Sequence, residues 1–232
     1  MIVWIISCIL IGLYCFVIGF YLYGWQKSKC LGLPAIGAAQ LPFISVIVPA
    51  RNEAENISNC IASLQGQHYP AGLFEVIVVD DESTDATFGI VAQLMCLWPG
   101  LKLLRSTSGP PTTATAKKRA IETGIAAAKD ELIVYTDADC THSPLWLRTI
   151  GGQWRQGPTK FIAAPVVFKT EPNLLSIFQT LDFMTLQGIT AASVATGFHT
   201  MCNGANIAYS RQAFYEVGGF SGIDNLPTGD DM

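Results

Sequence analysis

The sequence predicts an α/β fold in which helices cover both faces of a mostly parallel sheet, preceded by a transmembrane helix. Three observations support this prediction: an uncharged apolar segment at the start, an alternation of short apolar runs with helix-like segments after it, and polar clusters directly behind three of those runs. Half of the residues are hydrophobic, 14% are charged, and the formal net charge is -4 at pH 7. This composition suits one large α/β domain with a membrane segment.

The first segment has the length and composition of a membrane anchor. No charged side chain occurs in residues 1–26, and nearly every residue from Ile2 to Tyr23 is aliphatic, aromatic, Gly, Ser or Cys, which is long enough to cross a bilayer as a helix. A cleaved signal peptide is the alternative, but it requires a basic start and a shorter apolar core. Lys27 and Lys29 are the first charges. By the positive-inside rule we expect an anchor in the inner or plasma membrane and a cytoplasmic catalytic domain.

A linker over residues 27–41 and a catalytic domain over residues 42–232 are expected to follow. The first strand is predicted at Phe43–Pro49, an almost continuous apolar run typical of a strand buried on both faces. Later elements are indicated by apolar residues at helical spacing and by further apolar runs. In chain order they are a helix at Ala54–Gln65, a strand at Phe74–Val79, a helix ending near Trp98, a strand at Leu101–Leu104, a helix at about Ala116–Ala128 and a strand that ends before Asp137.

Polar residues stand directly behind three of these predicted strands, at Arg51, Asp81 and Asp137. Because parallel strands place their carboxyl ends on one edge of a sheet, we expect the three positions to converge on one pocket. Asp137 and Asp139 are one residue apart, so in an extended chain both carboxylates face the same side and can bind one hard divalent cation on a diphosphate. A polar turn after a strand is the alternative explanation for such a pair.

A nucleotide can still bind at this edge without either of the common phosphate loops. No G-x-G-x-x-G follows the first strand and no P-loop motif occurs in the chain, which argues against a dinucleotide-binding dehydrogenase and a P-loop NTPase. Asp81 can accept hydrogen bonds from a base or ribose, and Lys117 with Lys118 can bind phosphate at the start of a helix. Helix capping and a solvated surface are the respective alternatives.

The cysteines and histidines indicate no metal cluster. The seven cysteines contain no C-x-x-C pair, so neither a zinc site nor a disulfide framework is predicted. His68, His142 and His199 are isolated in the sequence and are expected on the surface or in loops. His142 is the exception of interest because it follows Asp139 closely.

Three motifs together resemble the family 2 inverting glycosyltransferases of GT-A fold, the group that includes cellulose synthase and hyaluronan synthase. They are Phe43–Glu53, Val78–Asp85 and Thr136–Asp139, and the resemblance covers Leu41 to the end of the chain. It implies a role for each matching residue. Ala50, Arg51 and Glu53 would line the nucleotide pocket, Asp81 would bind the uracil ring, Lys117 would lie near the phosphates, and Asp137 and Asp139 would hold Mg or Mn, with Asp139 the more direct ligand.

The second half of the chain extends this resemblance. After a strand-like run at Phe161–Phe168, the segment Asn173–Ala192 is either an ordinary core helix or, as the family implies, an amphipathic helix on the membrane surface. The segment Thr200–Phe220 resembles the acceptor side of the family, and Thr228–Asp231 resembles its E-D motif. The resemblance implies acceptor contacts at Asn203, Gly204, Asn206 and Asp230, and a catalytic base at Asp231.

The expected function is the transfer of a sugar, with inversion and metal assistance, from a nucleotide-diphospho-sugar, UDP-linked, to a hydroxyl of a carbohydrate or lipid acceptor. Family members continue past the E-D motif into a helix and often a Q-x-x-R-W motif, so the domain is expected to be incomplete at its C-terminus. Two alternatives stand beside this expectation. One is a membrane-tethered nucleotide-sugar-binding fragment without catalysis, and the other is a nucleotidyltransferase. No nucleic-acid partner is expected.

Overall fold

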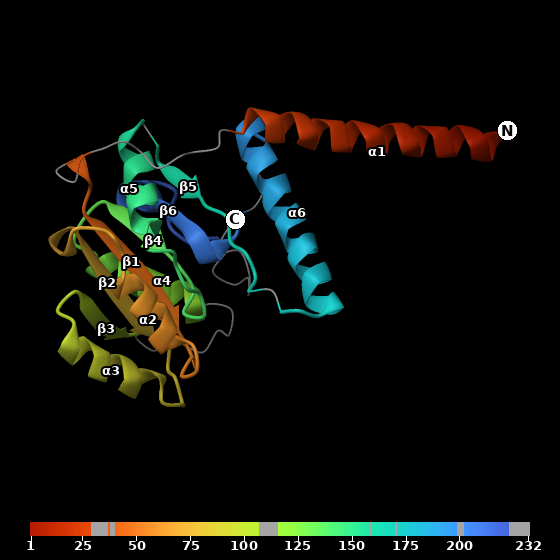
Figure 1. The fold of residues 1–232 in the computed structure, drawn as a ribbon. Coiled ribbons are helices and arrows are strands. Elements are labelled where there is room, and N and C mark those ends of the chain that lie inside the picture. Colours follow the sequence, from red (N-terminus) through yellow and green to blue (C-terminus); the bar gives the residue numbers. More distant parts are fainter. Residues whose placement is uncertain are drawn as a thin grey trace. The chain divides into compact units, whose positions relative to one another are not determined.

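The computed structural model describes residues 1–28, 37, 40–106, 116–157, 159–169, 171–198 and 202–222, and its chain forms two compact units (Figure 1). The first unit is built from Met1–Cys30 and Pro165–Cys202 and contains the helices α1 (Ile2–Lys27) and α6 (Leu174–Thr196). The second unit is built from Leu31–Ala164 and Asn203–Asp231 and contains all the strands of the described residues.

The second unit is organised by a six-stranded sheet of order β3-β2-β1-β4-β6-β5. The first four strands are mutually parallel, whereas β6 runs antiparallel to both β4 and β5. All residues of β1, β2 and β4 are buried, as expected of parallel strands covered on both faces. The strands are β1 (Ile44–Ala50), β2 (Phe74–Asp80), β3 (Leu101–Arg105), β4 (Leu132–Tyr135), β5 (Phe161–Ala163) and β6 (Ile207–Ser210).

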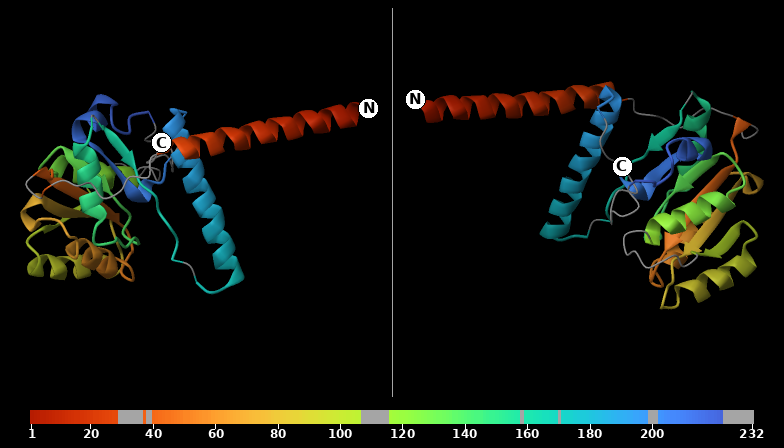
Figure 2. Two further views of the ribbon diagram at one scale, coloured as in Figure 1. Left: turned by 45° about the horizontal axis from the view of Figure 1, so that its top comes forward. Right: turned by 180° about the vertical axis from the view of Figure 1, so that it is seen from behind.

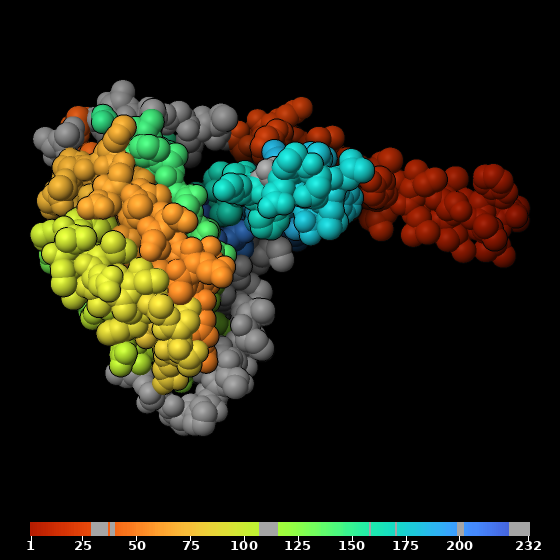
Figure 3. Space-filling view, turned by 60° about the horizontal axis from the view of Figure 1, so that its bottom comes forward, coloured from red at the N-terminus to blue at the C-terminus, as the bar shows by residue number. Residues whose placement is uncertain are grey.

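Helices cover both faces of this sheet, which confirms the predicted fold class. The helices α2 (Ile57–Gln65), α3 (Thr87–Leu97) and α5 (Trp146–Arg155) contribute to one apolar cluster with the side chains of one sheet face. The helix α4 (Ala116–Ala127) lies on the opposite face, in front of the sheet when the molecule is seen from behind (Figure 2). The short helix α7 (Arg211–Glu216) follows β6, and Figure 3 shows α2 and α3 side by side at the surface.

The expected elements differ from the structure at several boundaries. The helix expected from Ala54 begins at Ile57, after a turn closed by a hydrogen bond from Asn56 N–H to the carbonyl of Glu53. The strand expected to reach Phe168 ends at Ala163, because Pro165 has no N–H to continue a ladder. The sequence analysis did not predict α5, β6 and α7.

The first unit is held together by a close approach of α1 and α6. A side chain at Gly24 would place its Cβ 2.5 Å from the carbonyl oxygen of Ala192, so only glycine fits there. Near this crossing the rings of Phe20 and Phe198 pack edge to face with centroids 6.1 Å apart. Asn173 caps α6 by accepting a hydrogen bond from Ser176 N–H at 2.8 Å.

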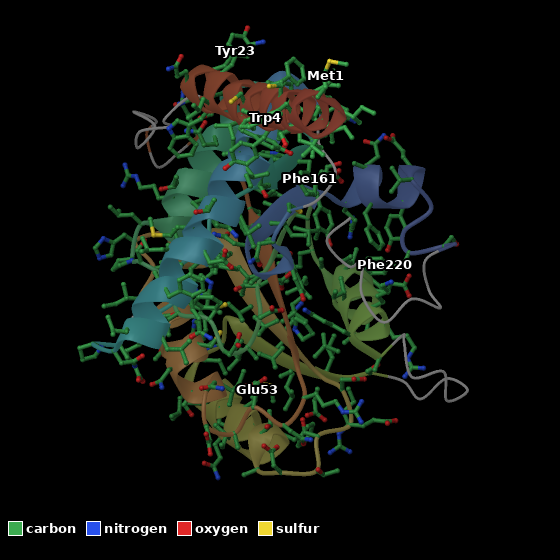
Figure 4. The ribbon with its side chains drawn as sticks, turned by 90° about the vertical axis from the view of Figure 1, so that its right-hand side faces the viewer. Met1, Trp4, Tyr23, Glu53, Phe161 and Phe220 are labelled. Carbon is green, nitrogen blue, oxygen red and sulfur yellow. The ribbon has the colours of Figure 1, made fainter. Side chains whose placement is uncertain are left out.

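Most of α1 carries exposed apolar side chains, among them those of Met1, Trp4 and Tyr23 (Figure 4). Within the described part of the chain, α1 is the one helix long and apolar enough to cross a membrane by length and composition. This finding agrees with a membrane anchor at the start of the chain.

The packing of α4 on the sheet leads to a test with two glycines. A Cβ at Gly124 would lie 2.5 Å from Cγ2 of the fully buried Ile47. We therefore expect Gly124→Ala to destabilise the chain by about 1–3 kcal/mol through overpacking, measured by urea unfolding in detergent. Gly89 of α3 is the matched control because a Cβ there meets nothing within 4 Å. Gly89→Ala should stabilise the helix by about 0.5–1 kcal/mol, and the same sign for both variants would contradict the described packing.

Candidate active site

Two loops at the carboxyl edge of the sheet bring Arg51 and Asp81 together. The ends of β1 and β2 are in register, with Ala50 opposite Asp80, and Asp81 N–H donates to the carbonyl of Ala50 at 2.9 Å. Just beyond them, Arg51 Nη1 lies 3.5 Å from Asp81 Oδ2. The Arg51 side chain is 57% exposed and the Asp81 side chain 6%. A buried carboxylate with one mobile cationic partner is suited to receive hydrogen bonds from a ligand.

Asn52 fastens the loop after β1 to the loop after β2. Its backbone has a left-handed φ of 56°, which Asn tolerates better than most residues. Its side-chain oxygen accepts hydrogen bonds from Thr84 N–H at 2.8 Å and Thr84 O–H at 3.2 Å, and its own N–H donates to Ser83 Oγ at 3.0 Å. The sequence analysis did not select Asn52, although an Asn between Arg51 and Glu53 directly behind a strand is a recognisable signal for such a turn.

Glu53 follows Asn52 in the same loop, and Figure 4 labels its side chain. Its N–H donates to Thr87 Oγ1 at 2.8 Å, and the N–H of Ala54 donates to Asp85 Oδ2 at 3.1 Å. The hydroxyl and N–H of Thr87 also bind Asp85, and these hydrogen bonds hold the pKa of Asp85 below its ordinary value. Asp85 therefore joins the loop of Glu53 to the start of α3.

Lys117 and Asp137 form the second charged pair of the site. Lys117 begins the first turn of α4, and its Nζ lies 3.0 Å from Asp137 Oδ1. The same oxygen accepts a hydrogen bond from the hydroxyl of Tyr135 at 2.8 Å. The lysine side chain is 46% exposed and the aspartate side chain 31%. The pair is therefore accessible, and a ligand phosphate can replace Asp137 as the ion-pair partner of Lys117.

Asp137 and Asp139 lie on a turn rather than on an extended chain. The N–H of Cys140 donates to the carbonyl of Asp137 at 3.2 Å, so the extended geometry assumed from the sequence is wrong. The exposed Asp139 accepts a weak hydrogen bond from the Cys140 thiol at 3.6 Å. Burial, with a further contribution from Asp139, raises the pKa of that thiol to about 11, which leaves Cys140 protonated.

The donor set fits a divalent metal that is completed by its substrate. In the described residues no group of three or more His, Cys, Asp or Glu side chains is placed to hold a metal ion. Mg²⁺ is commonly held by one or two carboxylates together with substrate phosphates and water. Asp137 and Asp139 match that requirement as hard oxygen donors at an accessible edge.

Behind this turn, His142 connects the loop after β4 to α2 and α5. Its Nε2 lies 2.9 Å from Oγ1 of the fully buried Thr136, and its Nδ1 lies 3.3 Å from Ser63 Oγ. The imidazole stacks on Trp146 with ring centroids 3.9 Å apart. Burial lowers the pKa of His142 to about 4, so the ring is neutral at pH 7. His142, which the sequence singles out because it follows Asp139 closely, therefore contacts the residue before Asp137 as well as α2 and α5.

The predicted acceptor residues occupy η3 (Gly204–Asn206), the turn that precedes β6. Asn203 caps it by accepting from Ala205 N–H at 2.8 Å, and Asn206 Oδ1 accepts from Trp146 Nε1 at 2.9 Å. Both amide oxygens therefore have partners within the protein, and Gly204 is buried. Contact with an acceptor stays a prediction for all three residues.

Three further residues selected from the sequence are Asp230, Asp231 and Lys118. Asp230 and Asp231 lie outside the described residues. Lys118 is 3% exposed, and its Nζ lies 5.8 Å from the ring centroid of Phe220, which Figure 4 shows beside α4. Lys117 is thus the accessible member of the lysine pair.

Comparisons with known proteins bear on the family of the chain. The model of Glycosyl transferase family 2 matches residues 45–218. The chain belongs to glycosyl transferase family 2. Its curated relatives in this family include glycosyltransferase AglE of Haloferax volcanii, 36% identical over 107 residues, which are 46% of this chain and 34% of AglE. Another is the beta-monoglucosyldiacylglycerol synthase of Nostoc sp., 35% identical over 99 residues, which are 43% of this chain and 20% of the relative.

Solved structures support the GT-A fold. Mannosyltransferase PcManGT from Pyrobaculum calidifontis, in complex with GDP-Man and Mn2+, superposes with a TM-score of 0.64 at 26% identity, over 91% of this chain and 58% of the other. S. aureus TarS 1-349 in complex with UDP-GlcNAc shares the fold with a TM-score of 0.51 at 21% identity, over 75% of this chain and 47% of the other. The matches to the curated relatives thus cover at most about a third of AglE and less of the synthase.

The neutral His142 predicts a dependence of stability on pH. Its pKa is about 4 in the folded chain against an ordinary value of 6.5, so the unfolded chain binds more protons between these values and stability falls as pH falls. We expect the free energy of unfolding to decrease by about 1–2 kcal/mol between pH 7 and pH 5 from this group. Urea unfolding at both pH values measures it. His142→Gln should remove this part of the slope, whereas replacement of the exposed His68 should leave it; an unchanged slope in His142→Gln would contradict the assignment.

Proposed function

We propose that the chain is the donor-binding part of a membrane-anchored glycosyltransferase that uses a nucleotide-diphospho-sugar and inverts the configuration of the transferred sugar. The observation that carries this proposal is the presence of two accessible charged pairs, Arg51–Asp81 and Lys117–Asp137, at the carboxyl edge of a sheet inside the family match. The solved structures of PcManGT and TarS are complexes with GDP-Man and Mn2+ and with UDP-GlcNAc, respectively. We propose UDP as the nucleotide and treat GDP as the alternative to be tested.

The residues divide the reaction between them. Ala50, Arg51, Glu53 and Asp81 form the nucleotide pocket, in which the carboxylate of Asp81 accepts a hydrogen bond from the base. Lys117 leaves Asp137 to bind the diphosphate at the start of α4. Asp137 and Asp139 hold a divalent cation, Mg or Mn, which supplies charge stabilisation to the leaving diphosphate.

The acceptor side completes a single displacement. Asn203, Gly204, Asn206 and Asp230 orient the acceptor, and Asp231 removes the proton of its hydroxyl as that oxygen attacks C1 of the sugar. Attack opposite the leaving group inverts the anomeric centre. We propose a carbohydrate or a lipid as acceptor, and the name of the related beta-monoglucosyldiacylglycerol synthase favours a lipid.

For the membrane we propose an anchor at residues 1–26, a linker at residues 27–41 and a cytoplasmic catalytic domain at residues 42–232. The exposed apolar surface of α1 supports the anchor, and the lysines behind it support the orientation. Because α6 packs on the C-terminal end of α1 at Gly24, it would lie at the membrane surface.

Nucleotide binding is the direct test of the proposed site. Calorimetric titration of UDP into the detergent-solubilised chain should show binding in Mn²⁺ and much weaker binding in EDTA. Asp137→Ala with Asp139→Ala should remove the effect of the metal, since no other described cluster can hold one. A parallel titration with GDP distinguishes the two nucleotides.

Asp130→Asn supplies the matched control for these substitutions. This aspartate is exposed in the second unit, and its carboxylate accepts a hydrogen bond from the neighbouring Glu131 N–H. The variant should bind UDP as the parent does. If neither UDP nor GDP bound the parent chain in the presence of metal, the proposal would be wrong for this chain.

Membrane anchoring makes a separate prediction. The full chain, expressed in bacteria, should stay in the membrane fraction after alkaline carbonate extraction, because α1 spans the bilayer. Deletion of residues 2–26 should release it or leave a peripheral protein that carbonate extracts. Extraction of the undeleted chain by carbonate would exclude a spanning α1, and UDP binding by the deleted chain would show that its sheet still folds.

A further inference from the structure

The loop after β4 is supported by a chain of polar contacts that the proposed reaction does not use. Thr136 directly precedes Asp137, is fully buried, and has its hydroxyl 2.9 Å from His142 Nε2. A buried hydroxyl without a partner is costly, so this hydrogen bond fixes the residue next to the proposed metal ligand. The loop is therefore positioned through its side chains as well as through its turn.

Counting donors assigns the form of the His142 ring. Ser63 Oγ has one proton, which it donates to the carbonyl of Cys60 at 2.7 Å, and it also accepts from His142 N–H at 3.1 Å. Toward Nδ1, 3.3 Å away, Ser63 is then an acceptor, so Nδ1 carries the ring proton. Nε2 is consequently unprotonated and accepts the hydroxyl proton of Thr136. These donors and acceptors are matched in the neutral ring with this tautomer, and the Thr136 side chain also hydrogen-bonds that of Cys140.

The contacts continue from His142 to the acceptor side of the site. The imidazole lies on the indole of Trp146 at the start of α5, with ring planes 33° apart. The indole N–H of Trp146, which is 9% exposed, donates to Asn206 Oδ1 at 2.9 Å. Asn206 closes η3 and its carbonyl accepts the N–H of Ala164, which follows β5. One side-chain relay thus links the Asp137 turn to the segment that begins β6.

We propose that His142 and Trp146 are positioning residues that hold the Asp137–Asp139 turn and the Asn203–Asn206 segment in a fixed mutual geometry, so that metal-nucleotide binding orders the acceptor segment. The inference rests on the proposed function, because it takes Asp137 and Asp139 as the ligands of the metal. His142 sets the turn through Thr136, and Trp146 transmits its position to Asn206.

The first test uses the two nitrogens of His142 separately. In His142→Asn the amide lies near the former Nδ1, so the bond to Ser63 is kept and the bond to Thr136 is lost. In His142→Gln the amide reaches the former Nε2 and can accept from Thr136. We expect His142→Asn to weaken Mn²⁺-dependent binding of UDP about tenfold, as is typical for residues behind a metal ligand, and His142→Gln to bind like the parent.

UDP affinities of the two His142 variants and the parent are compared under conditions in which the chains are equally stable. The control is His68→Gln, at an exposed histidine. Equal UDP affinity in His142→Asn and the parent would overturn the positioning role of His142. An equal loss in both His142 variants, in proportion to their loss of stability, would assign His142 to folding alone and would also overturn it. A parent chain that binds no nucleotide would instead reject the proposed function.

The second test concerns transmission to the acceptor side and uses Trp146→Phe, which keeps a ring against His142 but removes the N–H donor. Hydrogen–deuterium exchange of the peptide around residues 203–210 is measured with and without UDP and Mn²⁺. The parent should gain protection there on binding. Trp146→Phe should bind UDP but lose this gain, whereas Trp154→Phe on the same helix should behave like the parent. The same gain in Trp146→Phe, or none in a parent that binds UDP, would overturn the link.

Amide hydrogen exchange in the ligand-free chain tests the role of His142 without requiring that the chain bind a nucleotide. Amide exchange in residues 136–142 should be faster in His142→Asn than in His142→Gln, because only the former removes the hydrogen bond between Thr136 and the side chain at position 142, leaving Thr136 with its contact to Cys140. Equal exchange in the two variants would show that Thr136 is not held by His142.

Discussion

The site depends on the parallel pairing of β1 with β2 on one side and with β4 on the other. The pairing is offset: β1 and β2 end together at Ala50 and Asp80, whereas β4 ends at Tyr135, opposite Ile47. With a rise of about 3.3 Å per residue, the β4 loop begins about 10 Å behind the end of β1. The Asp137 turn is therefore set back from the Arg51 and Asn52 loop. The carboxyl edge of the sheet is therefore stepped, with the loop after β1 further forward than the loop after β4. In the proposed function the base binds at the first loop and the phosphates bind at the second.

The charged side chains at this sheet edge form ion pairs in which a ligand phosphate can replace the carboxylate. The ion pairs Arg51–Asp81 and Lys117–Asp137 each combine a half-exposed cation with a more buried carboxylate. Exposed pairs contribute about 0–1 kcal/mol, so a ligand phosphate can displace the carboxylate from Lys117 at little cost. By contrast, the contacts of Asn52 and Asp85 use backbone N–H groups as donors and fix the loops themselves. The two half-exposed cations thus lie next to loops whose backbone is restrained.

The sequence predicts structure best where the residues of one strand are enough to identify that strand. The apolar runs of β1, β2 and β4 and the charged residues behind them identify the sheet and its edge, because parallel strands buried on both faces leave a continuous apolar signal. The partners of His142 could not be predicted, since Ser63 and Trp146 reach it only after α2 and α5 have packed. The same holds for the Asp137 turn, where one backbone hydrogen bond from Cys140 replaces the extended geometry. The short β6 pairs antiparallel through contacts far apart in the sequence.

The chain takes a long path between the neighbouring strands β5 and β6. The strands β5 and β6 are paired neighbours, yet the chain leaves the sheet between them at Pro165, forms α6, and returns only at Asn203. The segment with α6 is thus an insertion in the β5–β6 connection, and its first residues back in the catalytic unit are those of η3. Asn206 of this turn is also the end of the relay through Trp146. The relay therefore connects the Asp137 turn to the residues at which the chain re-enters the sheet after this insertion.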